Sequence, residues 1–70
     1  MSIVKVIEVI SEGNSIDAAI KSAVEEASKT VEQIKQVNVE HIEGLVEGNK
    51  VTKFRVICKI SFVVKHHEKE

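Results

Sequence analysis

Every even position from Phe54 to Val64 is apolar, and most of the positions between them are polar or charged. The apolar positions are Phe54, Val56, Cys58, Ile60, Phe62 and Val64. Alternation with a period of two predicts a β-strand with one apolar face and one mostly charged face. At about 3.3 Å per residue the strand reaches roughly 36 Å, which is long for so small a domain. We therefore expect something outside this chain to cover part of it.

Length and cysteine content describe one small domain without covalent cross-links. A chain of 70 residues forms a single domain, which we place at residues 1–64 and expect to be followed by a disordered polar tail at 65–70. A single cysteine excludes an internal disulfide, and a core of this size contributes only about 3–5 kcal/mol. Cys58 lies on the apolar face of the last strand, so we expect it to pack as a small hydrophobic residue.

The charge pattern excludes several classes of partner. Ten basic and eleven acidic side chains are interspersed and give a net charge of −1. Proteins that bind nucleic acid combine a basic stripe with stacking aromatics, whereas the two aromatics here, Phe54 and Phe62, share the apolar face. No apolar run approaches the roughly 18 residues that span a membrane. Together with the lone cysteine, this predicts a cytoplasmic protein that binds neither nucleic acid nor membranes.

The first half of the chain predicts a strand and a helix. Residues 3–10 are rich in β-branched side chains and predict a strand rather than a signal peptide, because charged residues interrupt them. Residues 15–32 carry apolar side chains at every third or fourth position and predict an amphipathic helix of about five turns. Asn14 and Ser15 are both suitable N-caps for it. The small residues of its inner stripe are Ala19, Ala23 and Ala27.

The second half predicts a β-hairpin. Residues 34–46 predict a strand whose apolar positions change parity, so we expect a bulge or bend near Glu40–Glu43. Residues 47–50 carry hairpin turn signals, and the third strand follows from Val51. The order β, α, β, β is an α+β arrangement with the helix on one face of the sheet. A helix of about 27 Å cannot cover strands of roughly 36–40 Å, so we expect homo-oligomerisation to cover the rest.

The order and spacing of four short segments resemble those of the dodecin family. The segments are Val4–Ile10, Asp17–Ile20, Thr30–Glu32 and Ile60–Phe62. The resemblance extends from about Ile3 to Val64 without an obvious gap. It implies a βαββ fold in which a three-stranded antiparallel bent sheet wraps one amphipathic helix. It also implies a hollow homo-oligomer of twelve subunits, a homododecamer.

Many dodecins bind flavins in pairs between subunits, with a stacking Trp on the second strand and a hydrogen-bonding Gln on the third. The resemblance places Gln36 at the Trp position and Arg55 at the Gln position. Because the chain contains no Trp or Tyr, we carry over the fold and the assembly and keep flavin (riboflavin or FMN) as a weakened candidate ligand. Arg55 would instead pair with a phosphate or carboxylate ligand, or with Glu40 or another acid across the strands or across a subunit boundary.

Two classes of function follow from these residues. The first is a dodecin-like binding or storage protein that holds a small ligand near Gln36 and Arg55. The alternative is an assembly that is purely structural or that binds Ca²⁺ or Mg²⁺ where symmetry gathers acidic or histidine side chains. His41 and Glu43 share one strand face, but two ligands make a weak metal site in one chain. No nucleophile is paired with a base and an orienting group, so we expect a protein that is not an enzyme.

Overall fold

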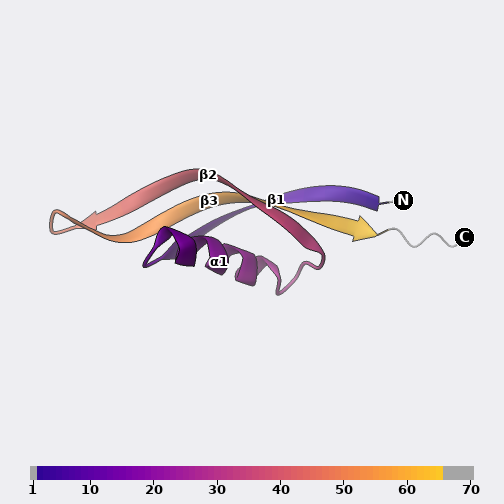
Figure 1. Ribbon diagram of the computed structural model, residues 1–70, viewed down its shortest axis with the longest axis horizontal. Coiled ribbons are helices and arrows are strands. Elements are labelled where there is room, and N and C mark those ends of the chain that lie inside the picture. Colours follow the sequence, from indigo (N-terminus) through magenta and orange to yellow (C-terminus); the bar gives the residue numbers. More distant parts are fainter. Residues whose placement is uncertain (1, 66–70) are drawn as a thin grey trace, which may run out of the picture.

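The computed structural model describes residues 2–65 and has the predicted order of elements. Strand β1 (Ser2–Gly13) is followed by helix α1 (Ile16–Ala27), and strands β2 (Ile34–Glu47) and β3 (Lys50–Lys65) form a hairpin (Figure 1). All three strands extend beyond their predicted bounds. Lys65 ends β3, so the predicted tail is wrong by that residue, and the remaining tail residues 66–70 lie outside the described residues.

The three strands form one antiparallel sheet in the order β1-β3-β2. The long alternating strand β3 is therefore central, and Figure 1 shows the sheet arching over α1. The predicted bulge is confirmed at Glu40, because Val39 and His41 pair with consecutive residues of β3. This extra residue reconciles the two parities of β2, since it returns Ile42 to the same sheet face as Val39. Two further register shifts lie near the ends of β2.

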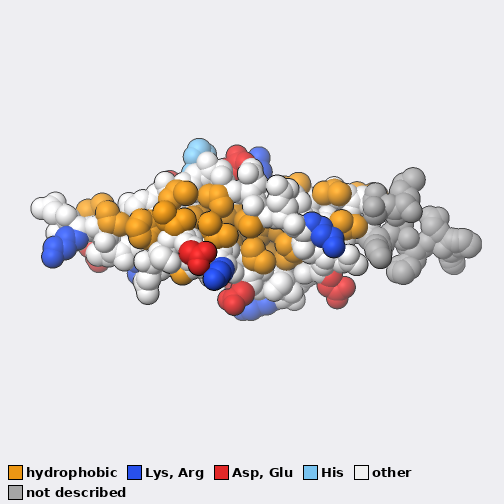
Figure 2. Space-filling model, viewed as in Figure 1, with side chains coloured by type: hydrophobic (Ala, Val, Ile, Leu, Met, Phe, Trp, Pro, Cys, Tyr) orange, Lys and Arg blue, Asp and Glu red, His pale blue; other side chains and the backbone are white. Residues whose placement is uncertain are grey.

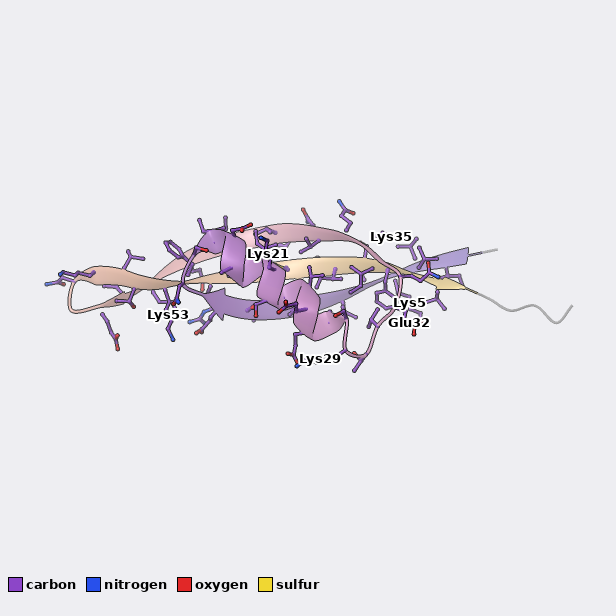
Figure 3. The ribbon with its side chains drawn as sticks, turned by 60° about the horizontal axis from the view of Figure 1, so that its bottom comes forward. Lys5, Lys21, Lys29, Glu32, Lys35 and Lys53 are labelled. Atoms are coloured by element: carbon purple, nitrogen blue, oxygen red, sulfur yellow. The ribbon has the colours of Figure 1, made fainter. Side chains whose placement is uncertain are left out.

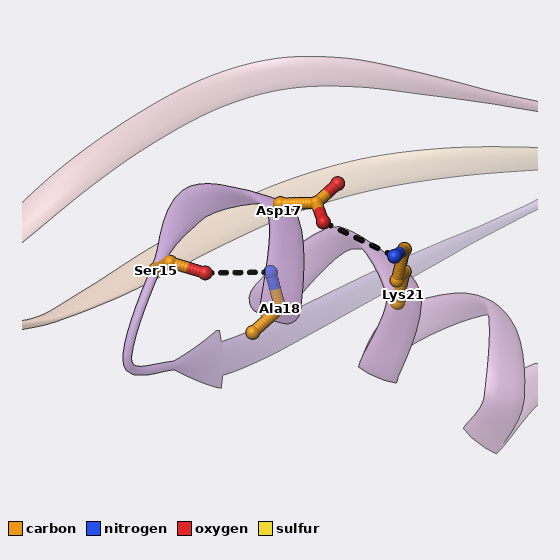
Figure 4. A network of polar contacts seen from close by, with 4 residues as sticks. All are labelled: Ser15, Asp17, Ala18 and Lys21. Atoms are coloured by element: carbon orange, nitrogen blue, oxygen red, sulfur yellow. Dashed lines mark hydrogen bonds and ion pairs between the residues drawn. The ribbon is translucent and has the colours of Figure 1, made fainter.

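Helix α1 begins as predicted but is shorter. Ser15 is the N-cap, and its Oγ accepts a hydrogen bond of 3.0 Å from the Ala18 backbone N–H (Figure 4). The prediction that the helix continues to residue 32 is wrong, because it ends at Ala27. The backbone N–H groups of Thr30 and Val31 both donate to the Ala27 carbonyl, which closes the last turn. Val31 lies beyond the helix and is half-buried. Its spacing of four residues from Ala27 is the spacing of a further helical turn, which is why the sequence predicted a longer helix.

The core lies between α1 and the middle of β3. Its buried residues are Ala19, Ala23, Ala27, Val56, Cys58 and Ile60. The small side chains on α1 allow the helix to approach the sheet closely, as the sequence predicted, and Cys58 packs among them. Burial raises the pKa of the Cys58 thiol, which keeps it protonated and unreactive. Within residues 2–65 no helix has the length and apolar character to cross a membrane.

Gly13 ends β1 where that strand meets the start of α1. A Cβ atom at this position would lie 2.7 Å from the backbone N of Ala19, which is closer than real contacts allow. We expect Gly13→Ala to lower the free energy of unfolding by about 1–3 kcal/mol, because strand and helix must move apart. Chemical denaturation measures this change. Gly44→Ala is the matched control, since its Cβ would meet Val51 Cγ1 at 3.4 Å; equal losses in both variants would contradict the prediction.

Much apolar surface remains uncovered by the chain itself. The molecule measures 60 × 19 × 13 Å, whereas a helix of 12 residues is only about 18 Å long. Figure 3 shows α1 crossing only the middle of the sheet, and Figure 2 shows hydrophobic side chains in a band along the molecule. On the face away from α1, Val4, Val6 and Ile10 are 62%, 55% and 61% exposed. We call this face of the sheet the open face.

Candidate ligand site

Arg55 lies on the open face in the middle of a row of charges that crosses the whole sheet. Glu12 on β1 and Glu43 on β2 are its direct partners in the antiparallel register. Arg55 Nε lies 3.8 Å from Glu12 Oε2 and 3.4 Å from Glu43 Oε1. The expected cross-strand pairing of Arg55 is confirmed, but Glu40 is the wrong partner. Glu40 occupies the bulge and has no partner on β3; its carboxylate accepts instead from the side chain of Asn38.

The Arg55 guanidinium is partly withdrawn from solvent. Its Nε atom is buried and makes no hydrogen bond with any described residue, although the side chain as a whole is 39% exposed. The exposed part of the side chain therefore belongs to its other atoms. With two carboxylates around one guanidinium, the row carries one net negative charge at neutral pH. We name these three residues, Glu12, Arg55 and Glu43, the charged row.

Gln36 lies on the same open face but at a distance from Arg55. It pairs with Ser61 of β3, and Ser61 and Arg55 have the same parity. Six residues of β3 separate these two positions, which corresponds to about 20 Å. One chain thus places Gln36 and Arg55 on one surface without bringing them into contact.

The open face changes character between these two residues. Near Gln36 it is apolar, because Val6 pairs across β3 with Ser61 and Val4 pairs with Val63. At the other end lies the charged row. Lys59 and Ile57 lie between the two ends, and His41 pairs with Ile57. The surface therefore has an apolar end at Gln36 and a charged end at Arg55.

A shallow hollow adjoins the charged row where β1 ends and the hairpin continues alone. Its volume is about 270 Å³. It is lined by Glu12, Leu45, Val46, Glu47, Thr52 and Lys53. Figure 3 places Lys53 on this hairpin arm, with Lys5 and Lys35 near the opposite end of the sheet. The hollow and the charged row share Glu12.

Glu12 was not predicted as a site residue from the sequence. It lies beyond the predicted strand, among Ser11, Gly13 and Asn14, which are residue types typical of turns. The strand instead continues to Gly13, and the alternation of Glu8, Ile10 and Glu12 is the signal that identifies it as part of the open face. Counting this alternation beyond Ile10 would have placed Glu12 on the same strand face as Glu8 and Ile10.

Within residues 2–65, metal-ligating side chains do not cluster. Among residues 2–65 no group of three or more His, Cys, Asp or Glu side chains is placed to hold a metal ion. His41 and Glu43 both lie on the open face, but Glu43 pairs with Arg55. Residues 2–65 of one chain therefore do not by themselves form a cation site.

Fold and surface together define a class: a small βαββ protein with an arched sheet, one helix on its inner face and an open face of mixed character. The dodecin family model matches residues 3–65. The chain belongs to the dodecin family. A search of the curated proteins finds no match.

Solved structures share this fold. The tt0972 protein from Thermus thermophilus is similar with a TM-score of 0.88 at 22% identity, covering 94% of this chain and 98% of that one. The dodecin from Streptomyces coelicolor gives a TM-score of 0.86 at 26% identity, covering 93% of this chain and 94% of its own. The dodecin from Streptomyces davaonensis gives a TM-score of 0.86 at 18% identity, covering 93% of this chain and 97% of that one.

Proposed function

We propose that this protein is a cytoplasmic homododecamer that binds and stores a small ligand between its subunits, at a site containing Gln36 and Arg55. The observation that carries the proposal is the open face, on which Val4, Val6 and Ile10 are more than half exposed in the single chain. Monomeric soluble proteins rarely leave large apolar patches uncovered. Membership of the dodecin family supports assembly as the means of covering it.

The character of the open face favours a ligand with an apolar ring and a polar edge. Val4, Val6 and Val63 offer apolar contacts at the end of the open face that holds Gln36, while Arg55 offers guanidinium donors at the other end. A flavin has both features. The family's stacking aromatic is replaced by Gln36, and both Phe residues lie on the helix side of the sheet, so the flavin ring would rest on aliphatic side chains alone.

The separation of the two residues supports a site between copies. A single chain holds Gln36 and Arg55 about 20 Å apart along β3. A second copy packed on the open face would bring a further Gln36 and Arg55 to the same ligand. We therefore place the ligand at a subunit boundary and propose binding without catalysis.

Titration with riboflavin tests this function. Flavin fluorescence is followed as untagged, assembled protein is added, and saturable quenching is expected. Gln36→Ala and Arg55→Ala should each weaken it. Lys21→Ala is the control, because Lys21 lies on the exposed side of α1 in an ion pair with Asp17 (Figure 4). Quenching that never saturates with riboflavin or FMN would contradict a flavin as the ligand.

The cation-binding alternative is tested with the same preparation. Calorimetric titration with Ca²⁺ and with Mg²⁺ should give no saturable heat if the assembly binds only a small organic ligand. Saturable heat that disappears in Glu43→Gln would support a cation site, since Glu43 has an exposed carboxylate on the open face.

A further inference from the structure

We infer that Glu12 and Glu43 make the open face select against phosphate-bearing ligands, although Arg55 would otherwise attract them. The inference rests on the proposed function and specifies the ligand class of that site as uncharged ring compounds. Glu12 and Glu43 act as positioning residues, because they work through the Arg55 side chain.

The charged row holds Arg55 between two carboxylates. An arginine that receives a phosphate presents its guanidinium fork with free donors. Arg55 is instead flanked on both neighbouring strands by carboxylates, at 3.8 Å from Glu12 and 3.4 Å from Glu43. Both residues are its direct partners in the register, so the backbone pairing of the sheet keeps them there. A phosphate could reach Arg55 only beside these two carboxylates.

The Arg55 guanidinium is itself partly withdrawn from solvent. Arg55 Nε is buried and has no hydrogen-bond partner among the described residues, so it is not available to a ligand approaching from solvent. The bidentate grip that uses Nε together with a terminal nitrogen is therefore closed to a phosphate. Only the two terminal nitrogens remain for a phosphate, which would meet them beside the carboxylates of Glu12 and Glu43.

The charges that surround the row occur in opposite pairs. The hollow beside the row adds the charges of Glu47 and Lys53, which cancel. Further along the open face, Glu8 and Lys59 are direct partners, and their opposite charges cancel as well. The row therefore keeps one net negative charge. A phosphate carries about −1.5 to −2 charges at pH 7 and is repelled.

Riboflavin and FMN provide the test, because they differ by one phosphate. Equilibrium dialysis measures the dissociation constants of both at low ionic strength, in the wild type and in Gln36→Trp. We expect FMN to bind more weakly than riboflavin, on the order of ten-fold, with the difference shrinking as salt is added. The double variant E12Q/E43Q gives the row one net positive charge and should reverse the preference.

The matched control is E25Q/E32Q, which removes two exposed carboxylates from α1 and the loop after it and changes the total charge equally. Its FMN-to-riboflavin ratio should equal that of the wild type. Native mass spectrometry confirms that each variant assembles like the wild type. Equal binding of the two flavins, or a ratio that E12Q/E43Q leaves unchanged, overturns the inference while the proposed function stands. Absence of binding of either flavin, even to Gln36→Trp, contradicts a flavin as the ligand of the proposed function and overturns the inference with it.

Discussion

Replacing Gln36 with tryptophan is expected to strengthen riboflavin binding about 5- to 150-fold. Stacking of a base-like ring on an aromatic side chain contributes about 1–3 kcal/mol, which corresponds to this range of affinity. Gln36 is exposed on the open face, where Ser61 of β3 lies between it and Val6 of β1, so an indole has room there and can extend toward the apolar end of the face. Quenching of riboflavin fluorescence in a titration measures the gain.

A tryptophan placed elsewhere controls for nonspecific stacking. Lys21→Trp puts the same ring on the exposed side of α1, where Lys21 has a side chain 75% exposed. It should leave the riboflavin affinity close to that of the wild type. A gain of equal size in Lys21→Trp, or none in Gln36→Trp, would show that the ligand does not lie at Gln36.

Truncation of Ile60 is expected to remove most of the chain's own stability. Ile60 is fully buried and is the largest side chain in a core that otherwise contains alanines, a valine and a cysteine. Ile60→Ala should cost about 2–5 kcal/mol, because the removed atoms lose their contacts and leave a cavity. A small core contributes only about 3–5 kcal/mol in total, so the variant should fold only as far as assembly supports it. Thermal denaturation followed by circular dichroism measures the loss.

Ile60→Val provides the graded comparison. It removes one methylene group from the same place and should cost only about 0.5–1.5 kcal/mol. Equal losses of stability in the two variants would mean that the surroundings of Ile60 collapse into the space left by its side chain. That result would contradict a core that is closely packed between β3 and α1.

The fold could be predicted from the sequence because its strongest signals are periodic. The even positions of β3 predicted both its strand character and its inward face, and Val56, Cys58 and Ile60 are indeed fully buried. The alanine stripe predicted the side of α1 that packs on the sheet. The end of α1 could not be predicted in the same way, because Val31 keeps the helical spacing after the chain has left the helix.

The candidate site was only partly predictable. That Arg55 pairs with an acid across the strands followed from alternation, but the identity of that acid depends on the bulge at Glu40, whose exact position shifts every later pair. Glu12 was missed because turn-forming residues next to it concealed the last residues of β1. That Gln36 and Arg55 are about 20 Å apart follows only from the observed register.

Native mass spectrometry of the untagged protein tests the central claim, that other copies of the chain cover the open face. Twelve chains of 7.8 kDa predict a particle of about 94 kDa, with any retained ligand visible as added mass. The same particle should persist at low micromolar concentration. A stable, cooperatively folding species of 7.8 kDa would contradict the account, since a single chain would then keep its apolar open face in water.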